Sequence, residues 1–556
     1  MSTVVGAPQL RPAGTRTSAG TLTGTWSLVR FVLRRDRVRL AVWTTSVVSF
    51  YAYFTAALDT AFADPAARQG RAAVMETPAG IVMGGPGYGI DDYTTGVAVA
   101  NEGTTWVVLA LAIMSILHVV RHTRAEEESG RSELVRAAAV GRHAPATAAF
   151  LTVVLVQAVV AVLGALAMIG VGADMAPVDS FGMTVGAGLS ALVFGAVAVV
   201  CCQLMEHGRA ATGASLAVFG IAFVVRAVGD LRALGGSALS WCSPIAWAQQ
   251  MRSFVDLRWW PVLLSAAATV LLLRLGAVLA SRRDFGGGMV PTRAGRAAAR
   301  PSLRSPFALA WRQQRAPLLW ACLGLGLMWY ATGTLMPEIG TMIGDVVADN
   351  PAAQRVFGDD PSVLAVTFLG VMLLFAALCC AAYAVVAGGR PRSEESEGRA
   401  EVTLALPVSR SRWLGAQLGV ATLGTVVVLV VSLYAMWLGA VGVGWDDQTF
   451  GQYTEALVTY LPALLVYVGL VGALFAWTPR LTGLAWVLVA YAFVVGMFGD
   501  LFALPRWASR ISPFAWVPAP FVDEAPAVDV AGLWAIATVL GALAFLGFRR
   551  RDLLTT

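Results

Sequence analysis

The chain has 556 residues, of which 57% are hydrophobic and only 13% are charged, and its net charge is +6. A soluble protein of this length carries about 25% charged residues, so the composition excludes an ordinary globular protein, and we expect no nucleic-acid partner. The charges fall in short clusters between apolar runs, and each run has about the 20 residues that cross a bilayer as a helix. The sequence therefore predicts an all-α integral membrane protein.

The first half of the chain is expected to cross the membrane six times. Residues 1–23 are polar and rich in Thr, Gly and Pro, which is typical of a disordered tail and not of a signal peptide. Residues 24–39 mix apolar and Arg side chains, as in a helix that lies on a membrane surface. Within the half formed by residues 24–281, spans are predicted at about 40–58, 104–120, 145–170, 182–204, 211–228 and 261–280.

The second half, residues 305–556, repeats this plan after an Arg-, Gly- and Pro-rich linker at 282–304. A surface segment at 305–316 leads into spans at about 317–336, 363–388, 413–441, 457–476, 482–499 and 530–548. The segments richest in Arg lie on one side of this arrangement, and such segments remain in the cytoplasm. We therefore expect both termini and the linker to be cytoplasmic.

An internal repeat relates the two halves. The first polar segment, residues 124–142, aligns without a gap with the second polar segment, residues 392–410, at an offset of 268. Three further matches follow in the same order: 222–231 with 492–501, S-P-I-A-W at 243–247 with S-P-F-A-W at 512–516, and 282–284 with 550–552. Four ordered matches indicate a tandem duplication. Because each half has an even number of spans, the two halves share one topology.

The polar segments carry the pattern R-x-E-E-x-x-G-R-x-E after the second span of each half, and the second one ends in P-V-S-R. With the surface helix, the six spans per half and the S-P-x-A-W motif, this pattern resembles the ABC-2-type permeases. The fused, duplicated form is similar to actinobacterial exporters of polyketide antibiotics and other drugs. The first half departs from the pattern, with Ala139–Val140–Gly141 in place of Pro407–Val408–Ser409. The two halves are therefore not expected to contact a partner subunit equally.

The resemblance implies that each polar segment is a coupling helix that docks on a separate ATPase subunit, with two copies of that subunit for one chain. The alternative for these segments is a solvated loop with local salt bridges. The chain contains no lysine, so it cannot supply the lysine of a P-loop, and ATP and Mg²⁺ belong on the partner. The residues expected to make the ATPase contact are Glu126, Glu127, Gly130, Arg131, Glu133, Glu394, Glu395, Gly398, Arg399 and Glu401.

The cargo pathway is assigned by the same resemblance, which makes the second and fifth spans of each half line the cavity. The pathway candidates, for which plain helix packing or lipid contact is the alternative, are Met114, Phe219, Phe223, Phe368, Phe375, Phe493 and Met497. Adaptable Met and aromatic surfaces suit varied amphiphilic ligands. Trp247 and Trp516 of the S-P-x-A-W motifs are candidates for the outer gate or for interfacial anchors.

The leading hypothesis is the non-catalytic permease subunit of an ATP-driven exporter of drugs, antibiotics or related metabolites, in the plasma membrane of a high-GC Gram-positive bacterium. A gradient-driven carrier with twelve spans is the alternative, but the predicted span interiors hold no Asp or Glu, which such carriers need. A membrane enzyme is a third reading, with only the paired acids Asp91–Asp92 and Asp446–Asp447 to support it.

Metal and disulfide chemistry is not expected. The six cysteines lie mostly in apolar spans and have no metal-ligand spacing. The four histidines, His118, His122, His143 and His207, are interpreted as scattered residues that form no cluster.

Overall fold

The structure is a computed structural model that describes residues 20–552, apart from residues 63, 77, 174, 285, 291–294, 296, 300, 337–360, 446–447, 499–504 and 518–525. The described residues form helices, turns and irregular segments, with no strand among them. Twelve described helices are long and apolar enough to cross a membrane. The predicted all-α membrane fold is confirmed. The chain divides into two compact units, Met1–Ala294 and Gly295–Thr556, and the boundary between them falls inside the predicted linker.

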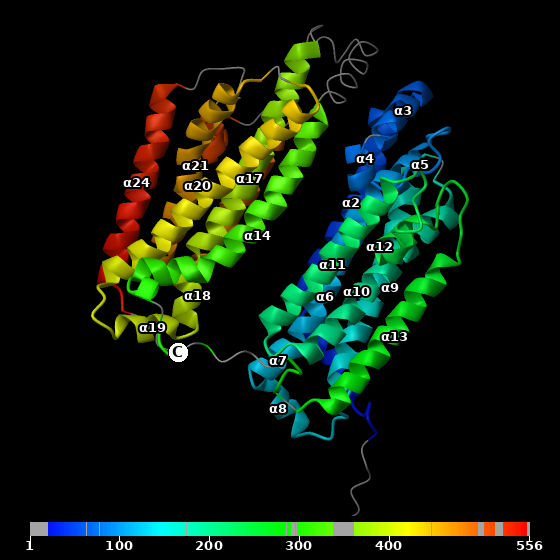
Figure 1. Cartoon of the computed structure of the whole chain (residues 1–556), viewed down its shortest axis with the longest axis horizontal. Helices are drawn as coiled ribbons and strands as arrows, with labels where there is room; N and C mark the ends of the chain where they lie inside the picture. Colours follow the sequence, from blue (N-terminus) through cyan, green and yellow to red (C-terminus); the bar gives the residue numbers. More distant parts are fainter. Residues whose placement is uncertain are drawn as a thin grey trace, which may run out of the picture. The chain divides into compact units, whose positions relative to one another are not determined.

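The first unit contains six candidate spans, Arg37–Thr60, Thr95–Glu128, Ala144–Val171, Pro177–Leu204, Gly208–Asp230 and Pro261–Arg282. Its α-helices are α1 (Thr25–Arg35), α2 (Arg37–Ala61), α3 (Pro65–Ala72), α4 (Pro78–Met83), α5 (Thr95–Ala98), α6 (Thr104–Arg121), α7 (Arg124–Glu128), α8 (Arg131–Arg136), α9 (Ala144–Val171), α10 (Pro177–Leu204), α11 (Gly208–Asp230), α12 (Pro244–Gln249) and α13 (Pro261–Arg282). Figure 1 shows α7 and α8 at the end of this unit where α13 finishes.

The second unit contains the other six candidate spans, Pro306–Thr334, Leu369–Ser396, Arg410–Gly442, Phe450–Trp477, Pro479–Gly496 and Ala527–Arg550. Its α-helices are α14 (Pro306–Thr334), α17 (Pro361–Gly388), α18 (Arg390–Ser396), α19 (Arg399–Leu404), α20 (Arg410–Gly442), α21 (Phe450–Trp477), α22 (Leu484–Phe498), α23 (Arg506–Ser509) and α24 (Ala527–Arg550). Here α18 and α19 lie at the end of the unit where α24 finishes (Figure 1).

The helix starts follow from local sequence chemistry. Several long helices begin with proline, which lacks the N–H that the first helical turn leaves unpaired, as at Pro177 and Pro261. Others begin after a hydroxyl side chain that accepts from a backbone N–H of the first turn. Ser409 does this for α20, and Thr449 forms a capping box with Gln452 at the start of α21.

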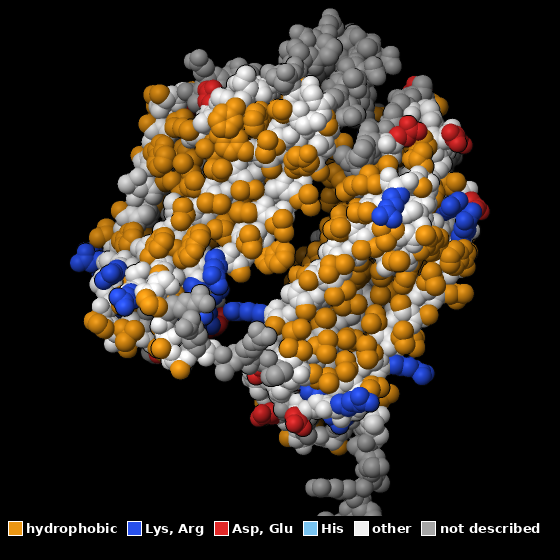
Figure 2. Space-filling model, viewed as in Figure 1, with side chains coloured by type: hydrophobic (Ala, Val, Ile, Leu, Met, Phe, Trp, Pro, Cys, Tyr) orange, Lys and Arg blue, Asp and Glu red, His pale blue; other side chains and the backbone are white. Residues whose placement is uncertain are grey.

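One long helix lies at the centre of each unit. In α10, 83% of the most apolar stretch is buried, and in α21 the corresponding share is 67%. Small residues allow the close packing of α10 that membrane helices use in place of a hydrophobic driving force. A Cβ at Gly186, for example, would meet the sulfur of Met251 at 2.4 Å. The flanks between the two ends of each unit are dominated by hydrophobic side chains (Figure 2), as a lipid-facing surface requires.

The two units differ at their first helices. Asp36 separates α1 from α2 in the first unit, with a non-helical backbone at φ −102° and ψ 16°. In the second unit the predicted surface segment and the first span form one continuous helix, α14, with Pro317 inside it. The residues at this point of each unit agree with the difference. In the first unit the short Asp side chain competes with the helix backbone, whereas in the second unit Gln313 and Gln314 are good helix formers.

Candidate functional site

Both polar segments have the same local structure. In the first, α7 is followed by Gly130 at φ 73° and then by α8. In the second, α18 is followed by Gly398 at φ 71° and then by α19. Left-handed backbone at these two positions is readily adopted only by glycine. Each segment is therefore a pair of short helices joined by a glycine turn, and the repeat in the sequence is a repeat in structure.

Replacing Gly130 or Gly398 with alanine is expected to strain this turn by about 1–2 kcal/mol, because an L side chain disfavours left-handed backbone. A Cβ at either position meets nothing within 4 Å, so no clash should add to the strain. Hydrogen–deuterium exchange should become faster in residues 124–142 or 392–410 alone. The control is Gly213→Ala in α11, which is equally uncrowded but has no positive φ. Unchanged exchange in both glycine variants would contradict the assigned turn.

Buried ion pairs fasten the first polar segment to the end of α13. Glu127 lies 2.7 Å from Arg124 Nη1 and 2.8 Å from Arg283 Nη2. The Arg124 side chain is 2% exposed, and its guanidinium also donates to the carbonyls of Glu206, Gly286 and Gly287. At the end of the segment, Arg142 donates to the carbonyl of Arg283 at 3.3 Å. The segment and the last span of the unit are therefore one connected piece.

The second polar segment is fastened to the end of α24 by the matching residues. Glu395 is paired with Arg551 and lies 3.6 Å from Arg392. Arg410 donates to the carbonyl of Arg551, just as Arg142 does to that of Arg283. The repeated residues Arg124/Arg392, Glu127/Glu395, Arg142/Arg410 and Arg283/Arg551 therefore share one structural role. Sequence reasoning assigned Glu127 and Glu395 to partner contacts, but both carboxylates face inward here.

The neighbouring glutamates contact the first helix of each unit. Glu126 is ion-paired with Arg35 at the end of α1, and Glu394 accepts from Gln313 in α14 at 3.2 Å. Glu394 also receives a forked pair from Arg399, at 2.9 Å from Nε and 2.8 Å from Nη2. This hydrogen bonding raises the pKa of the Arg399 guanidinium.

The exposed part of each segment is its second helix. Arg131 and Glu133 of α8 are exposed, and their side chains make no hydrogen bond or ion pair with any described residue. Glu401 of α19 has the same character. Next to these acids stand Leu134, which is 78% exposed, and Val402, which is 72% exposed. Each unit thus presents an apolar side chain beside a free carboxylate at the same position of the repeat.

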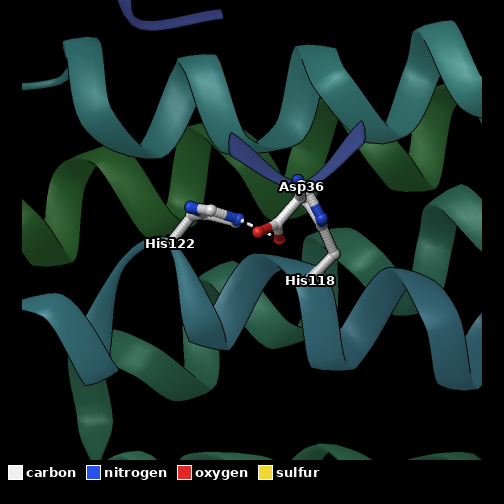
Figure 3. A group of neighbouring side chains, drawn as sticks. All are labelled: Asp36, His118 and His122. Carbon is white, nitrogen blue, oxygen red and sulfur yellow. Dashed lines mark hydrogen bonds and ion pairs between the residues drawn. The ribbon is translucent and has the colours of Figure 1, made fainter. Parts of the chain in front are cut away.

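Three buried titratable side chains meet close to the first polar segment. Asp36, His118 and His122 offer ligand atoms that all lie within 4.8 Å of one another, and the Asp36 carboxylate is drawn between the two imidazole rings in Figure 3. Burial alone would raise the pKa of Asp36, but the hydrogen bond to His122 and the charges of His122 and Arg121 hold it below the usual range. The interpretation that the histidines form no cluster is wrong for His118 and His122. Their spacing of four residues places both histidines on one helix face, and this spacing was the sequence signal for the cluster.

The family model described as the C-terminal domain of the multidrug efflux system permease Rv1217c matches residues 27–279 and, a second time, residues 303–549. The multidrug efflux system permease protein Rv1217c of Mycobacterium tuberculosis (strain ATCC 25618 / H37Rv) is 36% identical to the chain over 561 residues, which cover 99% of each protein. The chain belongs to this multidrug efflux permease family. One family model matching both halves agrees with the tandem repeat, and the twelve apolar helices make the permease a multi-pass membrane protein.

The predicted pathway residues of the permease have different surroundings. Met114 and Phe219 are buried in the core of the first unit, with exposures of 2% and 6%, while the ring of Phe223 stacks under Arg226. Phe375 of α17 and Phe493 of α22 are brought together, with ring centroids 5.9 Å apart. The side chains of Phe368 and Met497 lie outside the described part. A role in cargo passage stays a prediction for this whole set.

The two motif tryptophans have matching contacts. Trp247 donates from its indole nitrogen to the carbonyl of Trp241 at 2.8 Å, and Trp516 donates in the same way to the carbonyl of Arg510 at 2.7 Å. Each bond spans six residues and closes the turn that carries the motif. These bonds account for the tryptophans as structural residues, and the proposed gate stays a prediction. Of the paired acids, Asp91 and Asp92 are exposed, while Asp446–Asp447 lies outside the described residues.

Sequence reasoning missed a buried ion pair at the opposite end of the first unit. Arg226 and Asp230 lie on one face of α11, 3.4 Å apart, with both side chains fully buried. Arg226 also donates to the carbonyls of Ile81 and Val82, and Ser240 donates to Asp230 at 2.6 Å. The sequence signal for this pair was an Arg and an Asp four residues apart near the end of an apolar run.

Proposed function

We propose that the permease is the membrane subunit of an ABC-2-type exporter, which moves amphiphilic drugs or antibiotics out of the cell with energy from a separate ATPase. The partner binds ATP and Mg²⁺, because this chain has no lysine for a P-loop. Both polar segments face the cytoplasm in this proposal, with the two termini on the same side. Membership of a multidrug efflux permease family supports the class of cargo.

The observation that carries the docking proposal is the pair of exposed apolar side chains, Leu134 and Val402, each beside an unpaired glutamate. An exposed apolar side chain surrounded by polar ones matches the apolar core and polar rim of protein interfaces, in which the charges give specificity. The same arrangement in both units supports two docking points, one in each unit. The proposed contact with the ATPase is therefore limited to α8 and α19. It does not include Glu127 and Glu395, whose carboxylates face inward.

The anchors behind the docking points supply a route for coupling. A push on α8 reaches α13 through Glu127 and Arg283, and it reaches α1 through Glu126 and Arg35. In the second unit Glu395 and Arg551 serve the same purpose. The Glu127–Arg283 and Glu395–Arg551 pairs are largely buried, with no side chain more than 16% exposed, so they are costly to break. The Glu126–Arg35 pair is more exposed, at 19% and 27%. Movement of a docked ATPase would therefore be passed mainly to the last span of each unit.

The distribution of acids favours ATP over an ion gradient as the energy source. In the described spans, carboxylates lie near the ends of the helices, at Asp59, Glu102, Asp179, Asp230, Glu455, Asp529 and in the polar segments. Glu102 and Asp230 are paired with Arg71 and Arg226. A carrier that moves protons or Na⁺ needs an acid at mid-span that can exchange its ion.

The test is co-purification of the permease from its native membrane in mild detergent. A P-loop ATPase should accompany the wild type and should be lost from the double variant Glu133→Arg with Glu401→Arg, because the contact would then carry the wrong charge. The control is Glu455→Arg, a glutamate outside both segments. An ATPase that stays on the double variant would move the contact elsewhere. Its absence from the wild type under every mild condition would contradict the exporter proposal.

A further inference from the structure

The buried cluster of Asp36, His118 and His122 has the donor set of a transition-metal site. The two histidines lie one turn apart at the end of α6, and Asp36 stands at the break between α1 and α2. Exposures are 4% for Asp36, 5% for His118 and 4% for His122. His122 Nε2 already lies 2.8 Å from Asp36 Oδ2. His118 Nε2, however, is buried without a hydrogen-bond partner among the described residues, and a buried polar atom of this kind calls for an explanation.

We propose that Asp36, His118 and His122 bind a first-row transition-metal dication of the Zn²⁺ class. Two imidazoles and a carboxylate are the ligand types that such ions take, and three protein ligands leave a fourth position for water. Ligand atoms around a tetrahedral Zn²⁺ stand roughly 3.4 Å apart, given bonds of about 2.1 Å. The observed atoms, all within 4.8 Å of one another, need only small side-chain rotations to reach that spacing.

The surroundings of the cluster suit a metal in two further respects. Histidine ligands commonly direct their second ring nitrogen at a carboxylate, which fixes the ring, and His122 Nδ1 faces Glu126 Oε1 at 3.6 Å. His122 and Glu126 also line a cavity of about 460 Å³ between α1, the first polar segment and the end of α13. Of the three ligands only His122 lines this cavity, so an ion and its water would enter the site from the side of His122.

The guanidinium of Arg121 competes with the metal for the Asp36 carboxylate. Arg121 Nε lies 3.2 Å from Asp36 Oδ2, and its side chain is 43% exposed. Because the Arg121 side chain already reaches solvent, its guanidinium can leave the carboxylate and become hydrated there. Asp36 can therefore exchange Arg121 for a dication. Removal of the arginine should make metal binding tighter, whereas removal of a ligand should make it weaker.

In the second unit all three ligands are replaced together. At the matching positions it has Gln314 for Asp36, Val386 for His118 and Arg390 for His122. None of the three ligands is retained, although the contact between the first helix and the glutamate persists as Gln313 with Glu394. Arg390 instead lies 3.2 Å from Glu394, so a fixed cation stands where the first unit has His122. A metal would give the first unit the positive charge that the second has permanently.

The experiment measures metal binding directly and does not depend on any ATPase. The permease is purified with a tag that contains no histidine, stripped with a chelator and titrated with Zn²⁺, and with Co²⁺ as a spectroscopic probe. We expect one ion per chain and the visible absorption of tetrahedral Co²⁺ with nitrogen and oxygen ligands. His118→Val removes one ligand and should weaken binding by at least the roughly 10–100-fold that the loss of a residue supporting a metal ligand costs. His207→Gln, at an exposed histidine, is the matched control.

Each outcome decides the proposal. Loss of the ion in His118→Val and Asp36→Asn, its retention in His207→Gln, and tighter binding in Arg121→Gln would support the site. Wild-type protein that binds no more Zn²⁺ than His118→Val would overturn it and leave the cluster as an ion pair of Asp36 with His122. If the variants do not fold, the Co²⁺ spectrum of the wild type decides: a thiolate charge-transfer band or the absence of tetrahedral absorption would also overturn the site.

Discussion

Replacing Arg226 with methionine is expected to destabilise the permease by about 3–5 kcal/mol, the cost of removing one partner from a buried ion pair. Asp230 would remain as a fully buried carboxylate with only Ser240 donating to it. The carbonyls of Ile81 and Val82 would lose the guanidinium as well. At 2–4 °C for each kcal/mol, the apparent melting temperature in detergent should fall by roughly 6–20 °C.

The control for this variant is Arg258→Met. Arg258 pairs with Asp256 at 2.7 Å in the same unit, but the two side chains are 38% and 61% exposed. An exposed pair contributes about 0–1 kcal/mol, so this variant should melt close to the wild type. Adding Asp230→Asn to Arg226→Met should restore part of the lost stability, because Asn is uncharged and can still accept from Ser240. Equal melting of Arg226→Met and Arg258→Met would contradict a structural role for the buried pair.

The helical architecture could be predicted because the bilayer sets the length of each apolar run. The runs around 145–170 and 413–441, for example, correspond to the continuous helices Ala144–Val171 and Arg410–Gly442. Local breaks were harder to predict. The surface segment of the second half merges with the next span in α14, while Asp36 interrupts the corresponding stretch of the first half. Asp36 stands where the second half has Gln314, and the spacing of apolar residues does not reveal such a single exchange.

The direction of the polar side chains could not be predicted, because the ion pairs join residues far apart in the chain. Glu127 and Arg283 are 156 residues apart, and so are Glu395 and Arg551. A run of charges reads as a solvated surface until its partners are known. The repeat itself held the missing signal, since the Arg-Arg-Asp match at the end of each half contains those two arginines. Matching polar residues in both halves thus indicate that the halves share internal ion pairs as well as similar surface residues.

The strongest effect on function is expected from charges placed on the two docking points. Leu134→Asp together with Val402→Asp should abolish ATPase binding, because burying an unpaired carboxylate in the contact costs at least about 2 kcal/mol, or roughly 30-fold in affinity at each point. Both side chains are more than 70% exposed, so the fold should not change. Native mass spectrometry of the mixed complex should give two ATPase copies on the wild type, one on each single variant and none on the double variant.

The matched control is Leu234→Asp, which places the same charge on a leucine that is 62% exposed outside both polar segments. The two single variants should also differ from each other. Arg131 is exposed and available to a partner, whereas Arg399 is held by Glu394, so the first docking point keeps an extra charged contact when its leucine is lost. Binding at the second point should therefore be the more sensitive to its apolar residue. Two ATPase copies on the double variant, with wild-type affinity, would exclude α8 and α19 as the contact and leave the inner anchors to be tested in their place.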